Sequence, residues 1–251
     1  MTSARNTSLS IEYRLWQILV QSGWFASLLA ESLVADPTNT LSFGSADIKQ
    51  PWVFFDSAVK NTSRERVNVY VGGTLVDPTT YTVNFITGRV LFTSAPAGAV
   101  TADFDYFIAG VMENFEEGED QVVTPILDMV TLPVVAYGIT GFSGSPFAIG
   151  SSSLDRSYPL TITVLCQDDG QKKDLGDDLV RYLAYIPQVD FSTHSFLTAT
   201  QDVDTGFDLD TQKQGFLRVS GFNLAFPNPR KGGSDKEKHR ALVTLNVKNV
   251  V

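Results

Sequence analysis

Cysteine and histidine are scarce in this chain of 251 residues, which holds one cysteine, Cys166, and two histidines, His194 and His239. A single cysteine cannot form an intrachain disulfide bond or a cysteine-rich zinc site, and two histidines are too few for a histidine-based metal site. We therefore expect no disulfide framework and no metal centre. Cys166 is expected to lie in the core as a small apolar side chain.

The motifs of common enzymes are missing as well. The sequence has no P-loop, no G-x-G-x-x-G after a strand and no H-E-x-x-H. Residues 141–145, GFSGS, approach the nucleophile elbow of hydrolases but end in serine where that motif requires glycine. A hydrolase built from a serine, His194 and an aspartate has no motif behind it. We expect no enzymatic activity and no cofactor.

Basic residues are outnumbered, 19 against 28 acidic ones, which gives a net charge of −9. Nucleic acid is bound through clustered lysine and arginine, so a surface this acidic is unsuited to wrapping it. No apolar run reaches the length that crosses a bilayer, and residues 1–10 are polar. Neither a membrane partner nor a secretory signal is expected.

Apolar residues recur at helical spacing over residues 11–33, behind serines that can cap a helix. The spacing predicts a helix with a kink at residues 21–23, ended by Asp36-Pro37. Trp16 and Trp24 widen its apolar stripe, so the helix packs either on its own core or on a neighbouring subunit. The residues that set the spacing are Ile11, Leu15, Ile18, Leu19, Phe25, Leu28, Leu29 and Leu33.

Short alternating runs separated by turns fill residues 67–108. Val67, Val69 and Val71 alternate with polar residues, and Gly72-Gly73 and Thr87-Gly88 supply turns. This predicts a β-meander within an inserted all-β module of residues 43–109. The stretch VNVYVGGTLVDPTTYTVNFITGRVLFTSAPAGAVTADFDYF resembles a β module that recurs in structural proteins of tailed bacteriophages.

The second half of the chain has α/β character. The sequence predicts strands at 132–137, 160–166 and 189–191, a helix from Asp174 to Leu183, and two long strands at 214–226 and 240–250. A long Gly- and Ser-rich loop is expected at 138–150. The fold class is therefore α+β: a small α/β core of residues 1–42 and 110–251, with a mixed or antiparallel sheet and flanking helices, carrying the inserted β module.

This half resembles the neck and tail-terminator proteins of tailed bacteriophages. The resemblance lies in LPVVAYG and in FAIGSSSLDRSYPLTITVLCQDDGQKKDLGDDLVRYLAYIPQVDF, followed by a β-hairpin. It implies a virion protein, assembled in the host cytoplasm, that forms a ring of about six copies at the head–tail junction. Its implied partners are further copies, neck or connector proteins, and tail-tube or sheath proteins. DNA would pass through the lumen without sequence-specific binding.

Two groups of residues are candidates for contact with partners. An apolar loop with two tryptophans is the candidate subunit interface: Phe142, Pro146, Phe147, Ile149, Trp16 and Trp24. A basic connection between the last two strands is the candidate electrostatic contact, with an acidic neighbouring copy as the nearest partner: Arg230, Lys231, Lys236, Lys238 and Arg240.

Two alternatives remain open. The alternating carboxylates of residues 202–210 fail the EF-hand spacing, and either form an exposed turn or bind Ca²⁺ more loosely. In a different class of function, the aromatic residues of the β module form a carbohydrate- or receptor-binding surface. The residues that motivate it are Trp52, Tyr70, Tyr81 and Tyr106.

Overall fold

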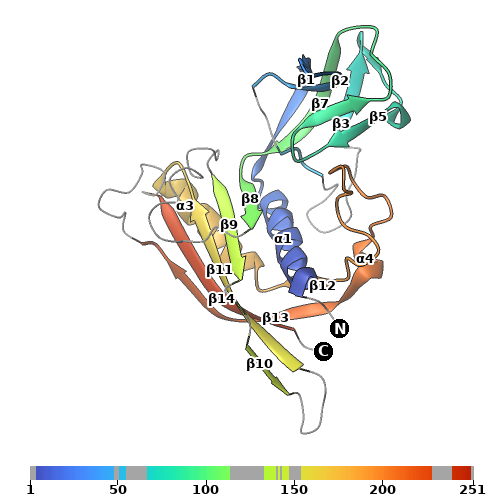
Figure 1. The fold of residues 1–251 in the computed structure, drawn as a ribbon. Helices are drawn as coiled ribbons and strands as arrows, with labels where there is room; N and C mark the ends of the chain where they lie inside the picture. The colour runs from blue at the N-terminus through green and yellow to red at the C-terminus, as the bar shows by residue number, and fades with distance from the viewer. Residues whose placement is uncertain are drawn as a thin grey trace. The chain divides into compact units, whose positions relative to one another are not determined.

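The computed structural model describes residues 4–47, 51–54, 67–113, 133–139, 141, 143–146, 154–227 and 239–249. It shows a mostly-β protein, broadly of the α+β class, with two curled sheets (Figure 1). The chain forms two compact units. Unit 1 comprises residues 1–18, 109–191 and 212–251, and unit 2 comprises residues 19–108 and 192–211. Each unit is therefore assembled from separate segments of the chain.

Unit 1 holds one of the two sheets and the two longer helices. The strands run in the order β12-β13-β14-β11-β9-β8, and β10 pairs with the first residues of β11. The described pairs are antiparallel except β8 with β9. The elements are α1 (Ala4–Gln21), β8 (Gly110–Glu113), β9 (Val134–Ile139), β10 (Ser143–Pro146), β11 (Leu154–Leu165), α3 (Asp169–Tyr182), β12 (Ile186–Val189), β13 (Lys213–Ala225) and β14 (Arg240–Asn249).

One face of this sheet carries the core. Val243 of β14 lies opposite Ile162 of β11, which lies opposite Tyr137 of β9, and all three are buried. Residues that face each other across strands share one side of a sheet, and side chains alternate along each strand. Thr244 and Asn246, between the buried residues of β14, are correspondingly more exposed. Figure 1 shows the sheet curving around α1.

Helix α1 contacts both edges of the sheet. The hydroxyl of Ser10 accepts a hydrogen bond from the backbone N–H of Val189, in edge strand β12, at 3.1 Å. The hydroxyl of Ser8 donates to the carboxylate of Glu113, in edge strand β8. Unpaired strand edges invite pairing with other chains, and proteins cover them with helices or loops. The first helix therefore satisfies one backbone donor of the edge strand β12 and contacts the edge strand β8 through a side chain.

Helix α3 packs closely against the same sheet at a glycine. The side chain of Asp168 caps the helix by accepting the N–H of Gln171 at 2.9 Å. A Cβ built on Gly176 would lie 3.4 Å from the Leu224 side chain and 3.6 Å from that of Ala241. Gly176 thus brings the helix backbone down onto β13 and β14.

Unit 2 is an antiparallel sheet with the strand order β4-β3-β7-β1-β2-β6-β5. Its core is aromatic: Trp52 stacks on Phe104 with ring centroids 4.2 Å apart, and Phe54 lies between Phe85 and Phe196. The elements are β1 (Phe25–Asp36), β2 (Asn39–Ser45), β3 (Val67–Val71), β4 (Thr74–Leu75), the 3-10 helix η2 (Pro78–Thr80), β5 (Tyr81–Asn84), β6 (Arg89–Phe92) and β7 (Val100–Phe107). The short helix α4 (Leu209–Gln212) follows where the chain returns to unit 1.

The edge strand β5 is covered by the segment 192–211. The backbone carbonyl of Gln201 accepts the N–H of Phe85 at 3.0 Å, and the buried carboxylate of Asp202 accepts the N–H of Val83 at 3.2 Å. Phe196 of the same segment stacks on Phe54. A segment distant in sequence therefore satisfies the backbone of this edge.

Several predicted elements are confirmed. The strands predicted within residues 67–108 are present as β3 to β7. They do not form the predicted meander, because β4 and β5 lie at opposite edges of the sheet and β7 pairs with β3 and β1. The predicted strands 132–137, 160–166, 214–226 and 240–250 correspond to β9, β11, β13 and β14. The strand predicted at 189–191 is wrong in its bounds, because β12 spans Ile186–Val189 and shares only Val189 with the prediction. Cys166 is buried. Of the connection between β13 and β14, only the residues adjoining the two strands are described.

The prediction of a helix over residues 25–33 is wrong, because these residues form β1. The pairing of β1 with β7 slips between Leu28 and Glu31, so that one extra residue is inserted. This β-bulge places Leu28 and Leu33, five residues apart, opposite the inward-facing Phe104 and Val100. The strict alternation that identifies a strand is thereby lost.

Three further expectations need correction. Helix α3 starts before Asp174, because Asp168 supplies the cap. The loop predicted at 138–150 contains strand β10. Unit 2 takes in residues 19–42 and 192–211, which the sequence pattern assigns to the core. The first segment belongs there because β1 and β2 pair within its sheet, and the second because it bonds to the edge of β5. No helix in the described ranges is long and apolar enough to cross a membrane.

Candidate interaction surfaces

A group of aromatic and cationic side chains in unit 1 extends from the exposed side of β13 to a buried arginine of α1. The rings of Tyr185 and Phe216 have centroids 4.4 Å apart, and each side chain belongs to a residue 46% exposed. The ammonium group of Lys213 lies 5.3 Å from the Phe216 ring centroid, and the guanidinium of Arg14 lies 5.4 Å from that of Tyr185. Cations at this distance are attracted to aromatic faces.

Arg14 is the buried member of this group, at 7% exposure. Its guanidinium donates to the carbonyl of Tyr182 at 2.9 Å and to the side-chain oxygen of Gln17 at 3.3 Å. Burial lowers the pKa of Arg14, because the charged form loses water. Both acceptors, the Tyr182 carbonyl and the Gln17 side chain, are uncharged. They bind the Arg14 guanidinium without neutralising its positive charge.

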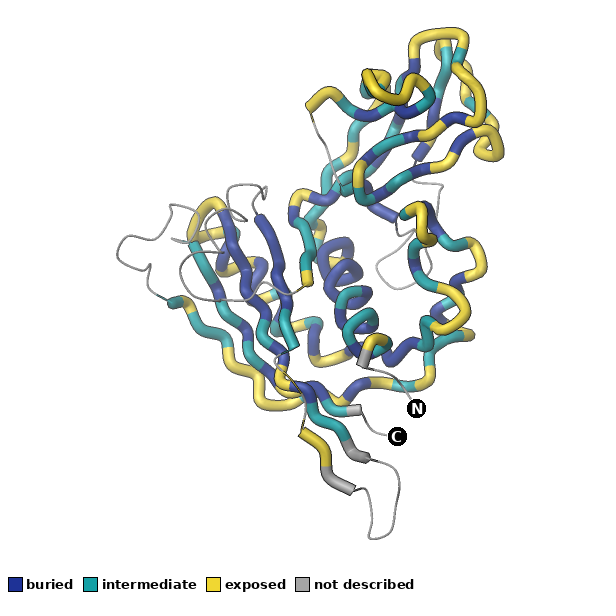
Figure 2. Tube along the Cα trace, viewed as in Figure 1, coloured by how far each residue is buried: buried dark blue, intermediate teal, exposed yellow. Residues whose placement is uncertain are grey.

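Exposed Arg218 completes the group, which we call the cation–aromatic patch: Arg14, Tyr185, Lys213, Phe216 and Arg218. Phe216 and Arg218 flank the buried Leu217 along β13, so alternation turns both outward. Figure 2 shows that much of β13 is exposed. This patch is not among the surfaces predicted from the sequence. Its signal in the sequence is the pair Phe216 and Arg218, two residues apart on the polar side of the predicted strand 214–226.

In unit 2 the β-bulge of β1 presents a single apolar side chain to solvent. Leu29 is 79% exposed, the most exposed of the large hydrophobic residues that the structure describes. The next residue, Ala30, has φ of +52°, a left-handed conformation that residues other than glycine rarely adopt. Bulges re-aim side chains, and strained backbone concentrates at sites of function.

Carboxylates on β7 hold this bulge. Asp103 accepts the backbone N–H of Ala30 at 2.7 Å and the hydroxyl of Tyr70 at 2.8 Å. The hydrogen bond to Asp103 raises the pKa of the Tyr70 phenol. Asp105 accepts a hydrogen bond from the hydroxyl of Ser27, which precedes the bulge in β1. The exposed Leu29 is thus flanked by negative charge.

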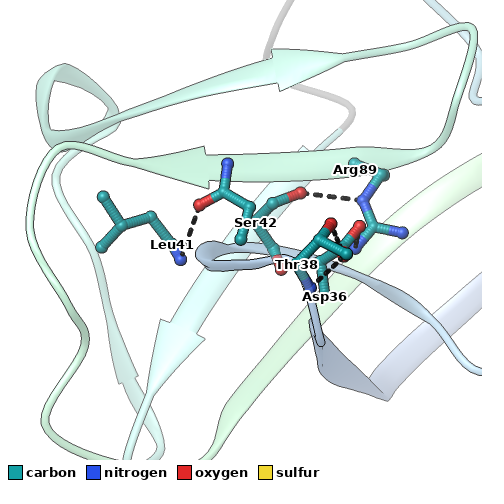
Figure 3. Close-up of polar contacts among 6 residues, drawn as sticks. Asp36, Thr38, Leu41, Ser42 and Arg89 are labelled. Carbon is teal, nitrogen blue, oxygen red and sulfur yellow. Dashed lines mark hydrogen bonds and ion pairs between the residues drawn. The ribbon is translucent and has the colours of Figure 1, made fainter.

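The turn between β1 and β2 is fixed to β6 by a polar network (Figure 3). Arg89 lies 3.1 Å from the carboxylate of Asp36 and donates from Nε to the hydroxyl of Ser42 at 2.8 Å. Asp36 also accepts the hydroxyl of Thr38 at 2.6 Å. The backbone N–H of Thr38 donates to the same carboxylate at 2.8 Å. The two hydrogen bonds from Thr38, together with the positive charge of Arg89, lower the pKa of Asp36. Gly44 leaves room for the arginine, since a Cβ there would lie 3.3 Å from its side chain.

A partly buried acid lies between α1 and the sheet of unit 1. The Tyr137 hydroxyl is 3.4 Å from the carboxylate of Glu12. Burial is the main cause that raises the pKa of Glu12, and the negative charge of Glu113 adds to it. Burial likewise raises the pKa of the Tyr137 phenol.

The carboxylates of residues 202–210 form hydrogen bonds with different partners. Asp202 serves β5, Asp204 lies 3.1 Å from Nδ1 of His194 and accepts the N–H of Gly206, and Asp208 accepts the hydroxyl of Thr211. Within the described ranges, no group of three His, Cys, Asp or Glu side chains is placed to hold a metal ion. His194 packs so closely on Gly206 that a Cβ there would lie 2.3 Å from its ring.

The predicted interface residues are only partly within the described structure. Trp16 is 3% exposed, which favours the alternative of a helix docked on its own core, and Trp24 is half-buried. Pro146 belongs to β10, while Phe142, Phe147 and Ile149 lie outside the described residues. Of the basic connection, Arg240 begins β14, and Arg230, Lys231, Lys236 and Lys238 lie outside the described residues.

The aromatic residues that motivate a carbohydrate-binding surface do not gather on one exposed face. Trp52 and Tyr81 are buried in the core of unit 2, and Tyr70 and Tyr106 are half-buried. Comparison of the chain with protein-family models, curated proteins and solved structures finds no match.

Proposed function

We propose that this protein is a structural subunit of a tailed-bacteriophage virion that assembles into a ring at the head–tail junction. Within that class we propose the role of tail terminator, which caps the tail tube and joins it to the neck. It would be assembled in the host cytoplasm, and DNA would pass through the ring without sequence-specific contacts. It acts by assembly rather than by catalysis.

The order of elements in unit 1 supports the proposal. The resemblance to neck and terminator proteins requires a strand after an arginine, a helix, a segment with the sequence IP-x-x-D and a β-hairpin. These elements are present as β11 with Arg156, α3, β12 with Asp190, and the pair β13–β14. Fold alone does not fix function, so this order supports the proposed class of protein, and the role must be argued from a surface.

The exposed aromatic side chains of unit 1 carry the proposal. Tyr185, Phe216, Phe222 and Phe226 each expose more than a third of their surface, and three of them lie on or directly after β13. Aromatic residues are enriched where proteins associate, because their large apolar area is removed from water there. An assembling subunit accounts for this concentration.

Native mass spectrometry of the purified full chain across a concentration series, with negative-stain microscopy, tests assembly. The proposal expects one discrete species of about six copies and an annular image. Phe216→Ser should shift the species toward monomer, whereas Leu75→Ser, which removes an exposed apolar residue from the short strand β4, should not.

The place in the virion is tested separately by gold-labelled antibody on purified particles of the phage that encodes the chain. Label at the junction of head and tail supports the proposal. Label at the distal end of the tail indicates a baseplate adaptor, and absence of the protein from purified particles contradicts a structural role.

A further inference from the structure

The exposed apolar sites of the two units are opposite in charge. Leu29 of unit 2 is flanked by Asp103 and Asp105, and the aromatic pair of unit 1 is flanked by Arg14 and Lys213. Arg218 is exposed two residues beyond Phe216 on β13. The contrast extends to whole segments. Residues 212–251 hold eight lysine and arginine residues against two acidic ones, while the two segments of unit 2 hold twelve acidic residues against five basic ones.

We propose that Leu29 in unit 2 of one copy docks on the cation–aromatic patch in unit 1 of the next copy. This inference rests on the proposed ring and names the two surfaces that build it. Leu29 would be covered by the rings of Tyr185 and Phe216, while Asp103 and Asp105 approach Lys213 and Arg218. The occupant of the patch is therefore a second copy of this chain.

The bulge explains why Leu29 is available. A regular strand would continue the alternation between β1 and β7, but the extra residue and the left-handed Ala30 interrupt it. The conformation of Ala30 is unfavourable for a residue with a side chain, and the carboxylate of Asp103 stabilises it. The strained backbone at Ala30 thus keeps the Leu29 side chain exposed to water. That exposure is unfavourable in free energy unless a partner covers the side chain.

The patch explains why the contact is specific. Rings with cations at their faces and edges favour an apolar side chain that arrives with negative charge nearby. Because the two surfaces differ, the contact is heterologous, running from the front of one copy to the back of the next. Heterologous contacts generate rings when the rotation closes, whereas contacts between identical surfaces stop at dimers.

Cross-linking between separately purified chains tests the contact directly. A full-length chain with Ser27→Cys is mixed with a differently tagged full-length chain carrying Gln214→Cys, and a short bismaleimide is added. Both positions are exposed and lie two residues from Leu29 and Phe216, so the contact residues themselves stay intact. The native Cys166 is buried and stays unreacted. The mixed pair should give at least fivefold more heterodimer than a pair with Leu75→Cys in place of Ser27→Cys. Equal yields from both pairs would overturn the inference.

Complementation tests the direction of the contact. Leu29→Ser and Phe216→Ser, each at an exposed position, should raise the concentration for half-assembly about tenfold. Mixed one to one, the two variants keep one intact pair of surfaces and should form a heterodimer that grows no further. If the mixture forms no heterodimer while the wild-type chain assembles, the contact runs elsewhere.

The outcomes separate this inference from the proposed function. If the wild-type chain forms a ring but the cross-link yield is the same for Ser27→Cys and Leu75→Cys, the ring stands and the proposed contact is wrong. If the chain forms no ring but gives the specific cross-link between positions 27 and 214, the contact is supported and ring assembly by the protein alone is contradicted. Both fail if the chain neither assembles nor cross-links specifically.

Discussion

The carboxylate of Asp202 accepts a hydrogen bond from the backbone N–H of Val83 at 3.2 Å, although 119 residues separate the two in the chain. Removing the acceptor leaves a buried donor without its partner, which typically costs about 1–3 kcal/mol. Asp202→Ala should therefore lower the free energy of unfolding by about that amount, and Asp202→Asn by less because an oxygen remains. Urea unfolding followed by tryptophan fluorescence measures both. Asp210→Ala, an exposed acid of the same segment, is the control.

Substitution of Gly176 should change stability in opposite directions as the side chain grows. Alanine meets only ordinary contacts of 3.4 Å or more and is a better helix former by about 1 kcal/mol, so Gly176→Ala should stabilise the protein. Gly176→Leu should destabilise it by about 1–3 kcal/mol, because α3 must move away from Leu224 and Ala241. Asp177→Leu, on the exposed side of α3, controls for surface effects. A destabilising alanine would show that the helix cannot adjust at all.

The stability that Asp36 contributes should depend on pH. Bonds from Thr38 and the charge of Arg89 lower the folded-state pKa below the ordinary value of 3.8, so the unfolded chain binds the proton first as pH falls. The contribution is present above about pH 5 and is lost as pH falls through the lowered pKa. The difference in unfolding free energy between the wild type and Asp36→Asn should accordingly shrink from pH 6 to pH 3. Asp47→Asn is the control, and a difference constant across this range would contradict the effect.

The thiol of Cys166 should be inert in the folded protein. Burial raises its pKa to about 12, so almost no thiolate is present at neutral pH, and the residue is inaccessible. Ellman's reagent should react with one thiol per chain in concentrated urea and with none on the same timescale in its absence. A rapid native reaction would mean that the end of β11 opens locally.

The strands of unit 2 were predictable where alternation is unbroken and turns are marked. The runs around Val67–Val71 and Tyr81–Val83 have period two and end in glycine or proline turns, and both form strands. Residues 25–36 were not predictable in the same way, because the bulge shifts the phase between Leu28 and Leu33. Their spacing then matches a helix as well as a strand.

The candidate surfaces were harder to foresee than the fold. Leu29 and Phe216 look like ordinary core residues in the sequence, since exposure depends on the register of β1 against β7 and of β13 against β12 and β14. Trp16 illustrates the same limit: the sequence leaves open whether a large aromatic residue beside a helix stripe packs on its own core or on a partner, and its position within α1 buries it. Register and bulges decide which side a residue faces, and composition does not encode them.

The discontinuous make-up of unit 2 has a consequence during synthesis. Strand β5 leaves the ribosome long before Asp202, the residue that covers its edge. At a translation rate of about 5–20 residues per second, the 119 intervening residues take roughly 6–24 s. Throughout that interval the open edge of β5 can pair with other nascent chains on the same messenger RNA, which leads to aggregation. Co-translational chaperones and widely spaced ribosomes should therefore increase the yield of soluble protein.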